Sequence, residues 1–166
     1  MKEILDDITR WRNAGKKIAV ARVIDVEGSG PRDAGAAMAV TQDGEVAGSV
    51  SGGCVEGAVV TEALEVLSSG TRGRRVTFGY SDDEAFAVGL TCGGTVHLFI
   101  QPLDETAFAA LATPLQNNNP VVIATVCGGS GIGSSIVATP ESLVGTLGNN
   151  ELDRVASRDA RGDLDL

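Results

Sequence analysis

The sequence predicts an α/β (α+β) fold: a mixed β-sheet with flanking helices, built from a duplicated β-β-β-α unit. Apolar, β-branched runs alternate with helix-patterned segments along the 166 residues. Glycine is abundant, with 22 residues, while aromatic residues make up only 4%, which is typical of a tightly turned protein. The third observation is an internal repeat that relates the two ends of the chain.

The elements of the first half follow from hydrophobic spacing and turn signals. Ile4, Leu5, Ile8 and Trp11 recur at the spacing of one helical face. Asp43-Gly44 separates two β-rich runs and therefore predicts a hairpin. The expected helices span 4–11, 54–67 and 104–112, the last capped by Asp104, and the expected strands span 17–26, 36–41, 45–50, 74–78 and 95–101.

Three segments of the second half repeat segments of the first half in the same order. They pair 120–126 with 17–23, 133–139 with 35–41, and 143–153 with 46–56. Asn149-Asn150 takes the place of Gly52-Gly53, and because Asn tolerates a positive φ we expect the same turn in both copies. We also expect a pseudo-two-fold axis. The loop that joins the first strand to the second strand is five residues longer in the first copy than in the second.

This organisation predicts one globular unit in two parts. Residues 1–113 hold the first repeat, 114–120 form a linker, and 121–166 form a degenerate second repeat that packs on the first.

Composition and charge exclude several classes of function. The net charge of −9 and a pI near 4.5 argue against a nucleic-acid or anionic-membrane surface. Apolar runs stay well short of the ~20 residues that span a bilayer, and the N-terminus lacks a signal-peptide pattern. Three distant cysteines without a CxxC, and a single histidine, His97, argue against a zinc site or a disulfide framework. A cytoplasmic location is the natural expectation.

The stretch GSVSGGCVEG, residues 48–57, is the strongest candidate site. Gly52 and Gly53 allow a sharp turn and the close approach of a ligand. Apolar spacing from Cys54 onward places this cysteine in the first turn of a helix, where N–H groups favour a thiolate and attract anions. The alternative is a half-buried, packed thiol. The second copy has Glu151 in place of Cys54, and this asymmetry favours a function for the cysteine.

Other motifs are more ambiguous. The glycine-rich segment 127–135 resembles a nucleotide-binding loop, but a strand rather than a helix is expected behind it, which argues against that site. Arg32 is either a solvated charge or a ligand for phosphate or carboxylate. Cys92-Gly93-Gly94 is either a β-bulge or part of a ligand site. His97 lies inside a strand pattern, so a packing role is expected and no triad with Ser51.

Three glycine-rich motifs together resemble the XdhC/CoxI family, accessory proteins of xanthine dehydrogenase and related molybdenum hydroxylases. The motifs are GSGPRDAGAAM (28–38), GSVSGGCVEG (48–57) and SDDEAFAVGLTCGG (81–94). The resemblance is strong over 17–103 and weak over 120–152. Many members continue into a Rossmann-type domain, which we expect to be absent here because the chain stops at Leu166.

The resemblance implies a non-enzymatic accessory protein that transiently binds the molybdenum cofactor (molybdopterin), aids its sulfuration and passes it to an apo-hydroxylase. A cysteine desulfurase-type sulfur donor is a further implied partner, and a homodimer is left open. Cys54 is the candidate metal ligand, since a thiolate is a soft ligand suited to molybdenum. The candidate cofactor-binding residues are Ser51, Gly52, Gly53, Cys54, Arg32, Cys92, Gly93 and Gly94.

Two alternatives compete with this interpretation. The first is a cysteine-dependent enzyme, because the expected strand-turn-helix placement of Cys54 resembles a nucleophile elbow, although it lacks an identifiable base. The second is a partner-docking domain that has lost cofactor binding. The leading hypothesis predicts one site per chain and fails if Cys54 lies more than ~10 Å from both Arg32 and Cys92, since such a separation exceeds direct hydrogen-bond and ligand range.

Overall fold

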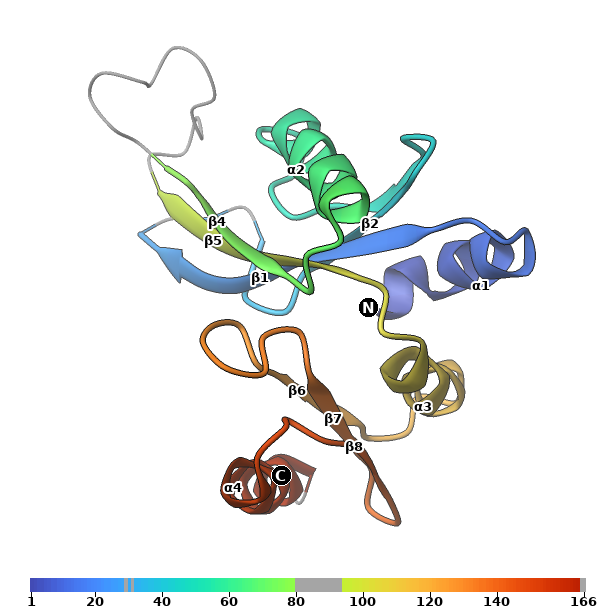
Figure 1. The fold of residues 1–166 in the computed structure, drawn as a ribbon, viewed down its shortest axis with the longest axis vertical. Helices are drawn as coiled ribbons and strands as arrows, with labels where there is room; N and C mark the ends of the chain where they lie inside the picture. Colours follow the sequence, from blue (N-terminus) through green and yellow to red (C-terminus); the bar gives the residue numbers. More distant parts are fainter. Residues whose placement is uncertain (29, 31, 80–93, 165–166) are drawn as a thin grey trace. The chain divides into compact units, whose positions relative to one another are not determined.

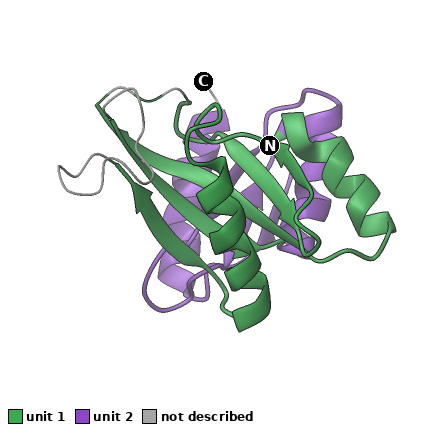
Figure 2. Ribbon diagram, turned by 90° about the horizontal axis from the view of Figure 1, so that it is seen from above, with its two compact units in different colours: residues 1, 3–103 green, residues 2, 104–166 purple. Residues whose placement is uncertain are grey.

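The computed structural model describes residues 1–28, 30, 32–79 and 94–164. The chain forms two compact units (Figure 2), one of residues 1 and 3–103, the other of residues 2 and 104–166. Each unit has its own β-sheet and is described by itself. The predicted α+β class, with β-sheets flanked by helices, is confirmed, and every strand pair described is antiparallel.

The first unit is a five-stranded sheet with the order β3-β2-β1-β5-β4 (Figure 1). Most elements begin and end within two residues of the positions expected from the sequence. They are η1 (Lys2–Ile4), α1 (Leu5–Asn13), β1 (Ile18–Glu27), β2 (Ala37–Thr41), β3 (Val46–Gly48), α2 (Glu56–Ser69), β4 (Arg74–Phe78) and β5 (Thr95–Pro102).

The core of this unit lies between α2 and one face of the sheet. Val59, Ala63 and Val66 of α2 are spaced to lie on one side of the helix and are fully buried. Alternate residues of the central strands point toward them, as the period of two in a strand requires. The strand residues of this cluster are Ala19, Ala21, Val23, Met38, Val40, Val96, Leu98 and Ile100.

The second unit is a three-stranded sheet with the order β6-β7-β8, flanked by two helices. Its elements are α3 (Glu105–Gln116), β6 (Val122–Thr125), β7 (Ser135–Ala138), β8 (Leu143–Gly145) and α4 (Asn150–Leu164). The predicted cap is present, because the Asp104 side chain accepts a hydrogen bond of 3.0 Å from Ala107 N. The strand expected behind the glycine-rich segment 127–135 is also present, as β7.

Helix α3 differs from its prediction. It continues through Pro114 to Gln116, so the expected linker over 114–120 begins inside the helix. The sequence analysis assigned residues up to 113 to the part with the first repeat. In the structure, α3 belongs to the second unit, because it packs on β7 and β8.

The predicted duplication is confirmed by the strand register. Ala21 pairs with Met38 in the first copy, and Ala124 pairs with Ile136 in the second. The loop that joins the first strand to the second has the same hydrogen bond across its base in both copies. Val23 N donates to the carbonyl of Ala36 in the first copy, and Val126 N donates to that of Ser134 in the second. The repeat also extends further than expected, since a helix precedes each set of three strands, α1 in one unit and α3 in the other.

One feature predicted for the second copy is wrong. Asn149 does not adopt a positive φ; Gly148 does, with φ of 84°. Asn149 instead caps α4, because its Oδ1 accepts hydrogen bonds from Glu151 N and Leu152 N at 2.9 and 3.2 Å. A capping side chain here allows the helix to start at Asn150, so the second copy has no equivalent of the Gly52-Gly53 turn.

Among the helices described, none combines the length and the apolar character that a membrane span requires.

Candidate functional site

The three glycine-rich motifs connect strands toward the same end of the first sheet, but they do not leave it at the same level. The register places Glu27, the end of β1, beside Thr95, the start of β5. It places Gly48, the end of β3, beside Met38 of β2, which pairs with Ala21, six residues before Glu27. The connections 28–36, 49–55 and 79–94 therefore adjoin strand ends that point the same way, because neighbouring strands of the sheet are antiparallel. Most of the third connection, residues 80–93, lies outside the described residues.

Cys54 precedes helix α2 and does not lie in its first turn, which corrects the prediction from the sequence. The helix begins at Glu56, and Gly52 and Gly53 have φ of 72° and 119°. These left-handed conformations cannot continue into a helix and favour glycine strongly. We call residues 51–55 the Gly-Gly-Cys turn.

The carboxylate of Glu56 organises this turn from the first residue of the helix. Its oxygens accept backbone hydrogen bonds from Val50 N at 3.2 Å, Ser51 N at 2.9 Å and Gly53 N at 2.9 Å. They also accept hydrogen bonds from the hydroxyls of Ser49, at 2.6 Å, and Ser51. The link from Glu56 to Gly53 spans three residues, the spacing of a capping box, but it lies ahead of the helix, whose N-cap is Val55.

Two serine hydroxyls complete this arrangement. Ser49 Oγ accepts a hydrogen bond of 2.8 Å from Gly52 N, and the buried Ser51 Oγ accepts one of 2.9 Å from Val55 N. The N–H groups of residues 50–53 therefore all bind within the protein. Ser51, predicted as a cofactor-binding residue, serves here as a fixed part of the turn.

The environment of Glu56 keeps it ionised. Partial burial raises its pKa, but the hydrogen bonds from Ser49 and Ser51 and from the backbone outweigh this effect and lower the pKa to about 2. The sequence analysis did not single out Glu56. The G-x-x-E spacing from Gly53 to Glu56 was the signal that could have identified it.

Cys54 lies half-buried and packs against the hydrophobic core of the first unit. Next to it, Gly53 is exposed, and a Cβ built on Gly53 would meet no atom within 4 Å. The turn thus presents a half-exposed sulfur beside an open stretch of bare backbone.

Arg32 lies in the connection between β1 and β2, with its guanidinium 3.5 Å from the carboxylate of Glu3 and its side chain 36% exposed. Gly94 is buried and directly precedes β5. Cys92 and Gly93 lie outside the described residues. The expected proximity of Cys54 to Arg32 and Cys92 stays a prediction.

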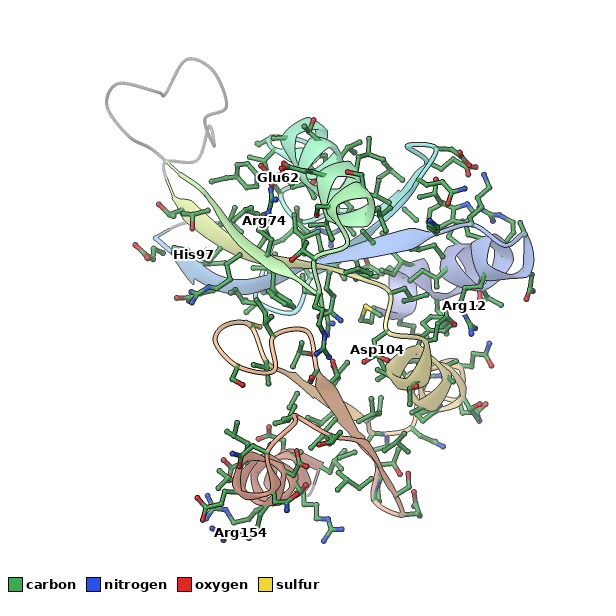
Figure 3. The ribbon with its side chains drawn as sticks, in the orientation of Figure 1. Arg12, Glu62, Arg74, His97, Asp104 and Arg154 are labelled. Atoms are coloured by element: carbon green, nitrogen blue, oxygen red, sulfur yellow. The ribbon has the colours of Figure 1, made fainter. Side chains whose placement is uncertain are left out.

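His97 has its ring engaged on the sheet. Its Nδ1 lies 2.9 Å from Thr77 Oγ1 on β4, and its Nε2 lies 2.7 Å from Glu27 Oε1 on β1. These cross-strand contacts fix the ring in place at the ends of three strands (Figure 3). The side chain therefore joins strands, in line with the packing role expected from the sequence.

Two further features bear on ligand binding. Across the described ranges, no three His, Cys, Asp or Glu side chains gather in a way that could hold a metal ion. An open cleft of about 810 Å³ adjoins the C-terminal half of α2 and is lined by Lys17, Gln42, Thr61, Leu64, Glu65, Leu67 and Ser68. This cleft lies at the other end of the strands from the Gly-Gly-Cys turn. Its lining includes Lys17, just before β1, and Gln42, just after β2, whereas the turn follows the end of β3.

Comparison with known proteins gives a family match within the first unit. Residues 11–79 match the model of the XdhC and CoxI family. The resemblance predicted from the sequence is therefore confirmed over this segment, which includes the Gly-Gly-Cys turn and Glu56.

Two curated proteins of Escherichia coli strain K12 are similar to the chain. It is 36% identical over 109 residues to the molybdenum cofactor insertion chaperone PaoD, covering 65% of this chain and 34% of PaoD. It is 40% identical over 83 residues to the uncharacterized protein YqeB, covering 49% of this chain and 15% of YqeB. The chain thus spans about a third or less of the length of these relatives.

A solved structure shares the fold. The crystal structure of a xanthine dehydrogenase from Bacillus halodurans aligns with a TM-score of 0.65 at 24% identity, over 84% of this chain and 43% of that chain. At this level of identity the likeness supports the fold alone.

Proposed function

We propose, from the XdhC and CoxI domain at residues 11–79, that this protein binds the molybdenum cofactor as cargo and passes it to an apo-form molybdenum hydroxylase. The observation that carries this proposal is the Gly-Gly-Cys turn, which lies within the matched segment. The name of the similar protein PaoD, a molybdenum cofactor insertion chaperone, supports the same role.

The residues of the turn fit such a cargo. A cysteine sulfur is a soft ligand, and molybdenum held by a dithiolene is a centre that such a ligand suits. Because the Cα of Gly53 faces open space, a flat and bulky pterin has room to lie against the backbone there. Cys54 would contact the metal, while Gly52 and Gly53 would leave space for the ring system.

The sequence suggested two groups for the cofactor's phosphate, the helix N-terminus and Arg32. Helix N-termini bind anions through free N–H groups, but the ionised carboxylate of Glu56 occupies the first position of α2. The N–H groups of residues 50–53, in the turn ahead of the helix, are taken up by Glu56 and Ser49. The guanidinium of Arg32 is the better candidate, because its contact with Glu3 is long and partly exposed. Gly94 and the segment before it stay part of the proposed site.

The remaining parts of the role are also proposals. The protein acts as an accessory factor and not as an enzyme, serves a xanthine dehydrogenase-type hydroxylase, and assists sulfuration with a cysteine desulfurase-type donor. A cysteine-dependent enzyme would need a base, and the chain's single histidine is engaged with Thr77 and Glu27. This engagement favours the accessory role over the enzymatic alternative.

A transfer experiment tests this function. The protein is loaded anaerobically with isolated molybdenum cofactor, freed of excess cofactor, and mixed with a cofactor-free xanthine dehydrogenase-type hydroxylase. We expect hydroxylase activity to appear with loaded protein and to fall at least tenfold with loaded Cys54→Ser. Equal activation by the two proteins would contradict a role for the turn. Failure of the wild-type protein to take up cofactor would leave the partner-docking domain as the better description.

A further inference from the structure

Both copies of the repeat carry a carboxylate in the helix that follows their third strand, β3 in the first copy and β8 in the second. Asp153 of the second copy corresponds to Glu56 of the first, and both residues accept hydrogen bonds from a hydroxyl and a backbone N–H at matching positions. In the first copy these donors are Ser49 Oγ and Val50 N. In the second copy they are Thr146 Oγ1, at 2.7 Å, and Leu147 N, at 2.6 Å. This shared pair of contacts connects the end of a strand to the start of a helix.

The first copy adds contacts that the second lacks. Glu56 also binds Ser51 N, Ser51 Oγ and Gly53 N, and so contacts two residues of the Gly-Gly-Cys turn itself. The contacts of Asp153 stop at Leu147, because its side chain is one methylene shorter and α4 already begins at Asn150. The longer side chain therefore serves the Gly-Gly-Cys turn and is not needed for the strand-to-helix connection itself.

We propose that Glu56 is the positioning residue of the cofactor site, holding the Gly-Gly-Cys turn in the conformation that presents Cys54 and Gly53 to the cargo. The inference rests on the proposed function for its ligand. Glu56 acts through the turn and does not touch the cargo, because its oxygens are occupied by Ser49, Ser51 and the backbone.

The physical reason is the conformational cost of this turn. Two consecutive glycines with positive φ lose much chain entropy when they are fixed. A carboxylate that accepts several hydrogen bonds offsets this loss, since hydrogen bonds to charged groups are about twice as strong as neutral ones. Without the contacts to Ser51 and Gly53, the turn would sample other conformations and the cargo would have to order it on binding, which lowers affinity.

The two copies supply matched variants for a test. Glu56→Asp shortens the side chain to the length of its counterpart, so it should keep the Ser49 and Val50 contacts and lose those to Gly53. Asp153→Asn is the control, because it disturbs the equivalent contacts in the second unit. Both variants are made in the full chain with all three cysteines kept, and peptide mass spectrometry after thiol labelling reports on Cys54 alone.

Four readouts separate positioning from general stability: amide exchange, alkylation of Cys54, the cofactor Kd and the Tm. For Glu56→Asp we expect amide exchange over residues 51–55 and alkylation of Cys54 to rise about tenfold, the loss of roughly one charged hydrogen bond. We also expect the Kd for isolated molybdenum cofactor to rise by a similar factor, while the Tm moves by only a few degrees. Asp153→Asn should speed exchange at Leu147 and leave the cofactor Kd unchanged.

The inference would be overturned by unchanged exchange at 51–55 in Glu56→Asp, or by faster exchange there with wild-type cofactor affinity. A large fall in Tm in place of the local change would also overturn it, since Glu56 would then be a general structural residue. If wild-type protein binds no cofactor, the proposed function fails, while the exchange and alkylation results still decide whether Glu56 holds the turn.

Discussion

Glu56 Oε2 accepts a hydrogen bond of 2.9 Å from the backbone N–H of Gly53, a residue whose φ of 119° favours glycine strongly. This contact ties the candidate binding turn to the first residue of helix α2. Because α2 packs its buried face on the central sheet, the turn is anchored to the core of the first unit. Binding sites are commonly built in this way, with an irregular loop held by a rigid scaffold.

The contacts of Glu56 predict that the stability of the protein depends on pH in the acid range. The pKa of Glu56 falls from an ordinary value of 4.5 to about 2 in the folded state. A lowered folded pKa stabilises the protein above pH 4.5, and this stability is lost as the pH falls from about 4.5 toward 2. We expect Glu56→Gln to be less stable than wild type by about 1–2 kcal/mol at pH 7, allowing for solvent screening.

Urea unfolding followed by circular dichroism at a series of pH values measures this difference. The gap between wild type and Glu56→Gln should narrow steadily below pH 4.5 and nearly close at pH 2. A gap that stays constant across this range would show that ionisation of Glu56 does not contribute.

The repeat predicts that two glycines are equally intolerant of a side chain. A Cβ on Gly48 would lie 2.4 Å from the carbonyl oxygen of Ala37, and a Cβ on Gly145 would lie 2.2 Å from that of Ser135. Both glycines also have a positive φ, of 77° and 97°. Changing either one to alanine should therefore cost about 2–3 kcal/mol.

Thermal unfolding of the two variants tests this, with Gly162→Ala as the control. Gly162 lies inside α4 with open space around its Cα, so alanine there should raise stability by up to about 1 kcal/mol. Wild-type stability in either Gly48→Ala or Gly145→Ala would argue against the close strand approach at that site.

The N-cap of α3 predicts a local effect in the second unit. Asp104→Ala removes the acceptor for Ala107 N and should cost about 1 kcal/mol, whereas Asp104→Ser should retain most of the stability. Amide exchange at Ala107, read alongside the Tm, measures the loss. Equal exchange in the alanine and serine variants would mean that the cap does not hold the helix end.

The sequence was sufficient to predict most of the elements. Strand β4, Arg74–Phe78, lies where its β-branched pattern placed it, and the repeat correctly aligned Ala21 with Ala124. These features depend on local periodicity and on the comparison of two copies, and both can be read directly from the residues.

The start of α2 could not be predicted in the same way. Apolar spacing continues from Cys54 and Val55 into the helix, so periodicity alone begins the helix at the cysteine. The helix starts later because Glu56 and Ser51 capture the N–H groups ahead of it, a contact pattern that apolar spacing does not record. Asn149 was misassigned for a related reason, since asparagine serves equally well as a helix cap and as a turn residue.

The central claim is that Cys54 binds the molybdenum cofactor, and its most direct measurement is the metal and pterin content of purified protein. Wild type, Cys54→Ser and the control Cys127→Ser are each produced together with the cofactor's biosynthetic enzymes and analysed for molybdenum and for pterin fluorescence after oxidation. We predict comparable molybdenum and pterin in wild type and Cys127→Ser, and a loss of most of both in Cys54→Ser. Wild-type amounts of molybdenum and pterin in Cys54→Ser would contradict the claim.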